Sequence, residues 1–291
     1  MKIFLWLFLF LPSGVVAQLP SIEQLVSPDE TVRENASKKL KGLSIQEKQK
    51  LVSQVTPLLK SRDWWVRSGA VHTLANLGPV AKGAIPDLIA VLDRDEPSIR
   101  SDAAAALGKI GANSPEVSRA LLRALKHEAP VVRMSVVEVL GQLKPTSEVI
   151  SALTQALRDK EWTVRTSVVK ALGKTRPTTK KVAKALVQSL KDDNFVVRLS
   201  VAEILGDVGP RIPQVVPALV QALKDENYVV RSNAAEALGK MKASGPAVVA
   251  ALAQILQEEK NDKVRISATL ALMRMGTPEA AQALKQSRGR P

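Results

Sequence analysis

The sequence predicts an all-α fold, a right-handed α-solenoid of about eight two-helix repeats. Apolar residues follow helical spacing along most of the chain, and strand signals are nearly absent. A fixed internal period of this kind is typical of stacked repeats, each of which buries its apolar faces against its neighbours. The period is carried by a Val-Arg or Ile-Arg pair that returns every 32 to 34 residues, with its arginines at Arg33, Arg67, Arg100, Arg133, Arg165, Arg198, Arg231 and Arg265.

The first helix of a repeat is exemplified by the segment VVPALVQALKD at residues 215–225. Its apolar residues return at three- and four-residue intervals, which places them on a single helical stripe. The second helix follows a short turn and is predicted to begin just ahead of each Val-Arg pair. Asp29, Asp63, Asn194, Asn227 and Asn261 stand four residues before their arginines. These residue types accept hydrogen bonds from the free amides of a first helical turn.

A glycine recurs inside the second helix, eight residues after the arginine, at Gly108, Gly141, Gly173, Gly206 and Gly239. Glycine costs roughly 1 kcal/mol relative to alanine at such a position. A recurring cost predicts a recurring reason, which we take to be the close approach of a neighbouring helix.

The ends of the chain differ from the repeats. Residues 1–17 combine Lys2, an apolar run from Ile3 to Leu11 and a small-residue ending, a pattern typical of a cleaved secretory signal peptide. We therefore expect a signal peptide at 1–17, the repeats at 18–276, and a covering helix with a basic tail at 277–291. The protein is expected to be exported, to a periplasm or the extracellular space, with no transmembrane segment after cleavage.

The composition limits the chemistry. The chain has no cysteine, which excludes disulfides and thiolate metal sites. Its formal charge is +14, and +13 once Lys2 is removed with the signal peptide. Such a surface favours an anionic partner without choosing among proteins, nucleic acids, glycans and lipids.

The pattern of a helix ending in ALKD, a short acidic turn and then VRxxAAxALGK resembles HEAT repeats, specifically the HEAT-like repeats of the phycobilisome lyase type. VPALVQALKD and DENYVVRSNAAEALGKM carry the resemblance, which covers about residues 20–276. It implies that the second helices line a concave surface. It also implies a structural role for the repeat arginines, which would pair with acidic residues of their own or a neighbouring turn. The first and eighth units depart from the pattern, with Lys41 and Met273 in place of the glycine.

Catalytic and metal sites find little support. The chain has two histidines, His72 and His127, and no nucleophile-elbow motif surrounds any serine. The pair His127 and Glu128 is similar to the iron-binding pairs of HEAT-like hydroxylases, but one such pair is too few to hold a metal. His72 is expected on an exposed helical position. We therefore expect no enzymatic activity, no metal, no cofactor and no small-molecule substrate.

Aromatic residues occupy one repeated position, three residues before the arginine. Trp64, Trp162, Phe195 and Tyr228 stand there. One interpretation, which we favour, is that each ring covers its turn and packs on the ring of the next unit. The other is a row of exposed rings that contacts a partner, because aromatic side chains are enriched at protein interfaces.

A basic run marks the middle of the chain, with no acidic residue between Lys170 and Lys191. The interpretation of a merely solvated face stands beside that of a binding site for an anionic partner. The candidate partner-binding residues are Trp162, Lys170, Lys174, Arg176, Lys180, Lys181, Lys184, Phe195 and Tyr228.

The leading functional hypothesis is a non-enzymatic, exported scaffold. It would bind another protein, one with an acidic surface, through its concave helix face and the basic central patch. An alternative that follows from the resemblance is a phycobilin-lyase-like chaperone for chromophore attachment. A third is a basic HEAT-like DNA-binding protein, which the mixed charge of the second helices disfavours.

Overall fold

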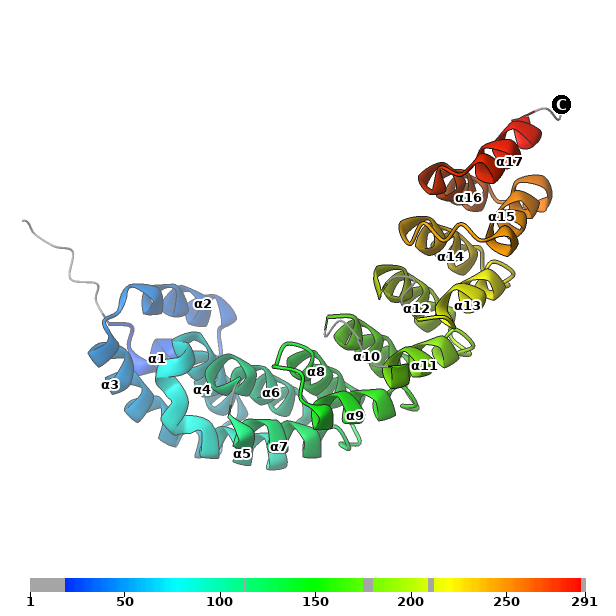
Figure 1. Ribbon diagram of the computed structural model, residues 1–291. Coiled ribbons are helices and arrows are strands. Elements are labelled where there is room, and N and C mark those ends of the chain that lie inside the picture. Colours follow the sequence, from blue (N-terminus) through cyan, green and yellow to red (C-terminus); the bar gives the residue numbers. More distant parts are fainter. Residues whose placement is uncertain (1–18, 113, 175–179, 209–211, 289–291) are drawn as a thin grey trace, which may run out of the picture.

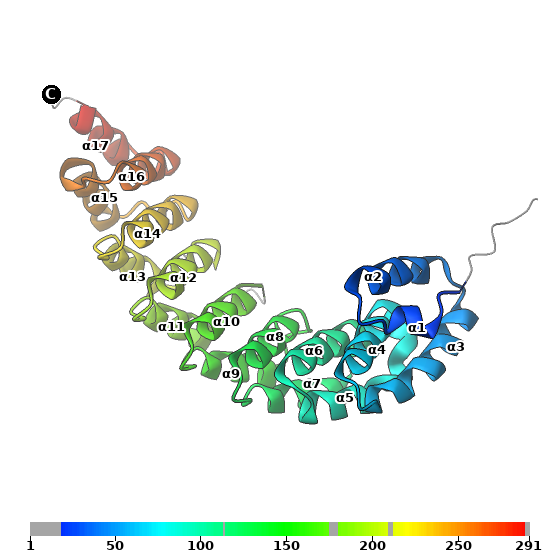
Figure 2. The ribbon, with the colours of Figure 1, turned by 180° about the vertical axis from the view of Figure 1, so that it is seen from behind.

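The computed structural model describes residues 19–112, 114–174, 180–208 and 212–288, without the side chains of Lys180, Val208 and Arg288. Within these ranges every regular element is helical, and the helices follow one another along an open crescent (Figure 1). The same arrangement seen from behind shows two layers that run the length of the crescent (Figure 2). The right-handed α-solenoid of about eight two-helix repeats is confirmed.

The outer, convex layer consists of the first helices of the units, which we call A helices. A four-residue helix, α1 (Ile22–Leu25), opens the series and packs against α4 rather than continuing this layer. The A helices that follow are α3 (Ile45–Val55, extended by the 3₁₀ turn η2 at Thr56–Lys60), α5 (Ile85–Arg94, preceded by η3 at Gly78–Ala84), α7 (Pro115–Ala124), α9 (Ser147–Ala156), α11 (Lys180–Ser189), α13 (Val215–Ala222) and α15 (Pro246–Glu258).

The inner, concave layer consists of the second helices, which we call B helices (Figures 1 and 2). They are α2 (Glu30–Lys39, followed by the 3₁₀ turn η1 at Leu40–Gly42), α4 (Trp64–Leu77), α6 (Pro97–Gly111), α8 (Pro130–Leu140), α10 (Trp162–Lys174), α12 (Phe195–Val208), α14 (Tyr228–Lys240) and α16 (Asp262–Met275). We number the units 1 to 8 by these helices. The expectation that the second helices line the concave surface is met.

One column of leucines runs through the core between the layers. The residue seven positions after the repeat arginine is a leucine in every unit and is at most 1% exposed in each. Burying such a side chain contributes about 1.5–3 kcal/mol relative to leaving it in water. The column comprises Leu40, Leu74, Leu107, Leu140, Leu172, Leu205, Leu238 and Leu272.

The starts of the B helices follow the predicted caps. The side chains of Asp29, Asn194, Asn227 and Asn261 each accept a hydrogen bond from a backbone amide in the first turn. Asp63 stands at the same place before α4 but makes no such bond. Four of the five predicted side-chain caps are therefore confirmed.

The recurring glycines lie where B helices meet. A Cβ atom added to Gly206 would lie 2.9 Å from the Cα of Ala237, and one added to Gly239 would lie 2.7 Å from the Cα of Ala271. Cβ atoms in real proteins essentially never approach a neighbour this closely. The predicted reason for the glycine, close approach of the next helix, is confirmed.

The C-terminal end is closed by α17 (Pro278–Arg288), which packs on α15 and α16. This is the covering helix that the sequence predicts. In the described part of the chain, none of the helices combines the length and apolarity needed to cross a bilayer.

Candidate functional site

The joints between units are held by the repeat arginines, as Arg165 shows. Its Nε and Nη2 donate to the two carboxylate oxygens of Asp192 in the next unit, both at 2.7 Å. Its Nη1 donates to the backbone carbonyls of Asp159 and Lys160 in its own turn, at 2.9 and 3.2 Å. One buried guanidinium thus fixes its own turn and the following one. Such bidentate, charge-assisted pairs are among the stronger hydrogen-bonded contacts in proteins.

Four further joints have the same fork-to-carboxylate geometry. Burial opposes ionisation of Asp159, but hydrogen bonds from Arg133 and from the Glu161 amide outweigh it and hold the pKa of this carboxyl below its ordinary value. For Glu259 the hydrogen bonds from Arg231 are the main cause of a lowered pKa. The four pairs are Arg67 with Asp95, Arg133 with Asp159, Arg198 with Asp225, and Arg231 with Glu259.

We call this series of arginine–carboxylate pairs the arginine ladder. The carboxylate that binds the arginine also closes its own turn, which explains why some joints lack the pair. Asp159, six residues before Arg165, also accepts from the amide of Glu161, two residues on. In unit 4 His127 holds this position and accepts from the Ala129 amide through Nδ1 at 3.0 Å. In unit 2 Ser61 does the same for Asp63 at 3.2 Å. Neither side chain carries the negative charge that the preceding arginine would bind.

Arg33 and Arg100 therefore stand at joints without a carboxylate. Both donate to backbone carbonyls of their own turns, and neither has a carboxylate within ion-pair distance among the described residues. Arg265, in the last unit, pairs with Asp262 of its own helix instead. The ladder thus runs unbroken only from unit 4 to unit 8.

The predicted aromatic row lies at the edge of the crescent where A helices turn into B helices. Trp162, Phe195 and Tyr228 are the first residues of α10, α12 and α14, and are 41%, 41% and 39% exposed. Among the described residues the one ring-to-ring contact joins Trp64 to its neighbour Trp65. Our favoured interpretation, that these rings pack on one another between units, is therefore wrong for the three consecutive units. They form a row of separate, partly exposed rings.

The basic run of the middle divides between the two layers. Lys170 and Lys174 are exposed on α10, in the concave layer, whereas Lys181 and Lys184 are exposed on α11, in the convex layer. Lys180 begins α11, and Arg176 lies outside the described residues. The run that is continuous in sequence is thus not one patch, because its two halves belong to helices of opposite layers.

The two histidines occupy different places. His72 donates from Nδ1 to the Ser68 carbonyl, and its Nε2 lies 3.9 Å from a carboxylate oxygen of Asp102 on α6. Burial raises the pKa of Asp102, an effect that His72 opposes. His127 lies in the turn before α8. Among the described residues no group of three potential metal ligands comes together.

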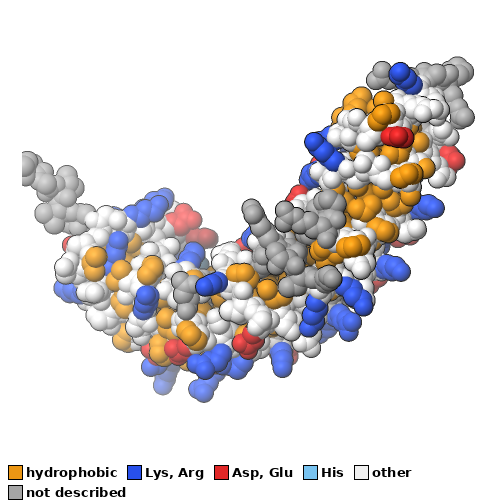
Figure 3. Space-filling model, viewed as in Figure 1, with side chains coloured by type: hydrophobic (Ala, Val, Ile, Leu, Met, Phe, Trp, Pro, Cys, Tyr) orange, Lys and Arg blue, Asp and Glu red, His pale blue; other side chains and the backbone are white. Residues whose placement is uncertain are grey.

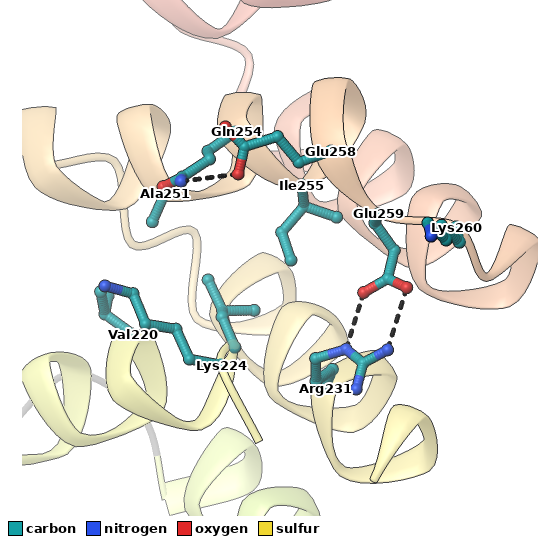
Figure 4. A pocket seen from close by; sticks show the side chains of 10 residues that line it. Val220, Lys224, Arg231, Ala251, Gln254, Ile255, Glu258, Glu259 and Lys260 are labelled. Atoms are coloured by element: carbon teal, nitrogen blue, oxygen red, sulfur yellow. Dashed lines mark hydrogen bonds and ion pairs between the residues drawn. The ribbon is translucent and has the colours of Figure 1, made fainter. Parts of the chain in front are cut away.

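Grooves of the same kind open between successive A helices at three joints. Figure 4 shows the one between α13 and α15, where Arg231 and Glu259 form the bottom and Gln254 donates to Glu258 on one wall. A second lies between α9 and α11, and a third between η2 and α5. Their volumes are about 530, 700 and 430 Å³ in that order.

The groove between α9 and α11 contains a cation that the sequence analysis did not single out, Arg158. It lines the groove together with Lys181, Lys184 and Lys191 of the basic run. A signal for Arg158 exists in the sequence. The position seven residues before the repeat arginine is cationic in five units, as Lys60, Lys126, Arg158, Lys191 and Lys224.

Stacked helix pairs joined by an arginine ladder and lined by a continuous inner face define a helical-repeat solenoid. The chain belongs to the HEAT-repeat family, because the family profile for HEAT repeats matches residues 19–108, 85–173, 118–203 and 183–273. A profile for the phycobilisome lyase HEAT-like repeat matches residues 264–287. No curated protein sequence is significantly similar to the chain.

Solved structures resemble the fold at low sequence identity. An engineered protein is 22% identical over 92% of this chain and 82% of its own, with a TM-score of 0.50. The Escherichia coli protein YibA is 17% identical over 87% and 90%, with a TM-score of 0.63. Kap121p, solved bound to Ste12p, is 16% identical over 87% of this chain and 32% of its own, with a TM-score of 0.63. At these identities the likeness shows the fold alone.

Proposed function

We propose that this chain is an exported, non-enzymatic HEAT-repeat scaffold that binds another protein along its concave face. The observation that carries the proposal is the continuity of that face. In all eight units the residues five and nine positions after the repeat arginine are exposed, and where both belong to the B helix they lie on the same side of it. A surface repeated in this way suits a long polypeptide partner better than a small molecule.

The charge of the concave face changes from unit to unit along the C-terminal half. This pattern would fix where along the face a partner binds. Unit 5 presents Lys170 and Lys174, and unit 6 presents Glu203 and Asp207. In unit 7 Lys240 lies 3.6 Å from Glu236 and 3.8 Å from Asp207, which reduces the net charge there.

Unit 8 presents Leu270 and Arg274 at these positions, and two further exposed apolar residues lie beside Leu270. Ile266, Leu270 and Met273 are 58%, 45% and 48% exposed and follow one face of α16. Exposed apolar residues that gather on one face mark interaction sites more often than residues scattered singly do. A partner that places acidic side chains against unit 5 and apolar ones against unit 8 would match this half of the face.

Export rests on the sequence of residues 1–17, whose apolar run and small-residue ending support a cleaved signal peptide. Detection of a mature chain beginning at Gln18, by mass spectrometry of the extracytoplasmic fraction, would support this part of the proposal. A chain retaining Met1 in the cytosol would contradict it.

One observation favours a second candidate, the phycobilin-lyase-like chaperone. It is the profile match at residues 264–287. Incubating the purified protein with a free bilin tests this function directly. A shifted bilin absorbance spectrum would support it, and an unchanged spectrum would remove it.

The scaffold proposal is tested by photocrosslinking in the native extract. A benzoylphenylalanine at position 203 replaces the concave Glu203, and one at position 116 replaces the exposed Glu116 of α7 on the convex layer. We expect one defined protein to be captured from position 203 and not from 116. Its purified form should bind the Lys170→Glu, Lys174→Glu variant about tenfold more weakly. Equal capture from both positions, or from neither, would refute concave binding.

A further inference from the structure

The groove between α9 and α11 differs from its counterparts in charge. It is lined by five cationic residues, Arg158, Arg165, Lys181, Lys184 and Lys191, against two acidic ones, Asp159 and Asp192. The grooves shown by α13 with α15 and by η2 with α5 each have three cationic residues against two acidic ones. The geometry repeats along the rod, whereas the excess of positive charge belongs to the middle groove.

The two carboxylates of this groove are already bound by repeat arginines. Asp159 is bound by Arg133 at 2.7 Å and Asp192 by Arg165 at 2.7 Å, and their side chains are 12% and 9% exposed. Among the described residues no carboxylate lies within ion-pair distance of Arg158, Lys181, Lys184 or Lys191. The η2 groove contrasts with this, because Lys60 reaches across it to Asp87 at 2.8 Å.

The middle of the convex layer therefore holds a group of cationic side chains without carboxylate partners among the described residues. Figure 3 shows Lys and Arg side chains gathered along the outer margin of the crescent, over the A helices of its middle. A cleft lined by one sign of charge concentrates the opposite charge and speeds its capture.

The remaining lining residues indicate a polypeptide as the anion. Gln155 on α9 and Gln188 on α11 face the groove from its two walls. Each side-chain amide offers both a donor and an acceptor, which is what a peptide backbone requires and a phosphate chain does not. The groove has no aromatic residue on which a nucleic-acid base could stack.

We propose that the α9–α11 groove binds an acidic, extended peptide segment of a protein partner. This inference rests on the proposed scaffold function and adds a second binding surface, on the layer opposite to the concave face. In an extended segment alternate side chains point the same way, about 6.5–7 Å apart. Carboxylates on alternate residues would then meet the lysines of α11 while the peptide backbone meets the two glutamines.

The test uses the purified full-length protein and fluorescence anisotropy. The probe is a fluorescein-labelled ten-residue peptide of alternating Glu and Ala, and the control probe has Gln in place of Glu. The groove variant is Lys181→Glu, Lys184→Glu. The matched control is Lys224→Glu, Lys260→Glu, which makes the same change of charge in the α13–α15 groove.

We expect the Glu peptide to bind, the Gln peptide to bind at least about tenfold more weakly, and the groove variant to lose about tenfold or more in affinity. The control variant should lose less than about threefold. The neutral pair Lys181→Gln, Lys184→Gln should fall between, and retained helicity by circular dichroism shows that each variant folds.

Equal losses in the groove and control variants would mean that net charge alone attracts the peptide, which overturns the proposal. A single-stranded oligonucleotide or a sulfated oligosaccharide that binds the groove more tightly than the peptide would overturn it as well. Absence of peptide binding together with concave capture of a partner from the extract would refute this inference and leave the scaffold function standing.

Discussion

The joints of units 4 to 8 and the joint between units 3 and 4 solve the same problem with different residues. In units 4 to 7 every repeat arginine binds a carboxylate of the next unit's turn, as Arg198 binds Asp225. At the joint of units 3 and 4 His127 takes the place of the carboxylate and accepts a hydrogen bond from the Ala129 amide, while Arg100 donates only to the backbone carbonyl of Asp95. The comparison separates two roles that Asp225 combines, closing its own turn and joining it to the unit before. The turn before α8 is closed without an ion pair, so we expect the ion pairs to affect how strongly neighbouring units hold together.

The largest expected effect comes from removing an arginine where the ladder is complete. Arg198→Met leaves Asp225 in the joint without its cation, with side-chain exposures of 8% for the arginine and 10% for the carboxylate. Breaking a buried ion pair in this way costs about 3–5 kcal/mol. We expect a clearly lower urea midpoint. Arg100→Met, which removes only the hydrogen bond to the Asp95 carbonyl, should cost about 1 kcal/mol. Similar midpoints for the two variants would show that the carboxylates contribute nothing.

The glycine contacts give the second comparison of the joints. In Gly206→Ala the new methyl group would meet the backbone of Ala237, which has little freedom to move. Overpacking of this kind costs about 1–3 kcal/mol, more than the roughly 1 kcal/mol that alanine gains in helix propensity. Gly42→Ala is the control, because nothing lies within 4 Å of the added atom.

Thermal unfolding followed by circular dichroism measures both variants. Gly206→Ala should lower the Tm and Gly42→Ala should not. At the joint of units 3 and 4, Gly108→Ala would meet side-chain atoms of Val139 rather than backbone, and should cost less than Gly206→Ala. A Gly206→Ala protein as stable as the natural one would refute close backbone approach.

Restoring the missing carboxylate should strengthen the weak joint. His127→Asp keeps an acceptor for the Ala129 amide and adds a negative charge for Arg100. We expect a gain of about 1 kcal/mol. His127→Asn is the matched control, since it keeps the acceptor without the charge, and it should leave the urea midpoint nearly unchanged. A higher urea midpoint in both variants would show that the gain comes from turn closure and not from the ion pair.

Lowering the pH is expected to reduce the stability of each joint less than the substitutions do. The pKa values of Asp95, Asp159, Asp192 and Glu259 are lowered in the folded protein. A lowered carboxyl pKa stabilises the fold above the ordinary value, 3.8 for Asp and 4.5 for Glu, and this contribution is lost as the pH falls through the folded-state value. The Tm should therefore decline below about pH 4.5. The His127→Asp protein should decline more steeply than the natural one, and parallel curves would count against the restored pair.

The sequence predicts the repeat, its helices and its glycine contacts because these depend on residues within one unit or at one fixed interval. It does not predict which acid meets which arginine. Arg165 and Asp192 lie 27 residues apart, and their meeting depends on how far one unit is shifted and rotated against the next.

The candidate site shows the same limit. Lys170 and Lys184 belong to one basic run in the sequence but to opposite layers of the fold, because one lies on α10 and the other on α11. The partnership of His72 with Asp102 was likewise missed, since it joins neighbouring units. The aromatic row was located correctly at the turn edge, but the contacts between its rings were not.

Each unit from 5 to 7 binds the following unit through its arginine and receives the arginine of the preceding unit through its turn carboxylate. These three units each have both groups, so a gene duplication or loss of one whole unit among them would again join an arginine to a carboxylate. Residues 193–225 have the length of one such unit. Their removal would set Glu226 directly after Asp192 and would keep the carboxylate that binds Arg165. The rod can thus change its length in evolution one unit at a time among units 5 to 7, whereas a duplicated unit 4, with His127 in its turn, would add a further joint without a carboxylate.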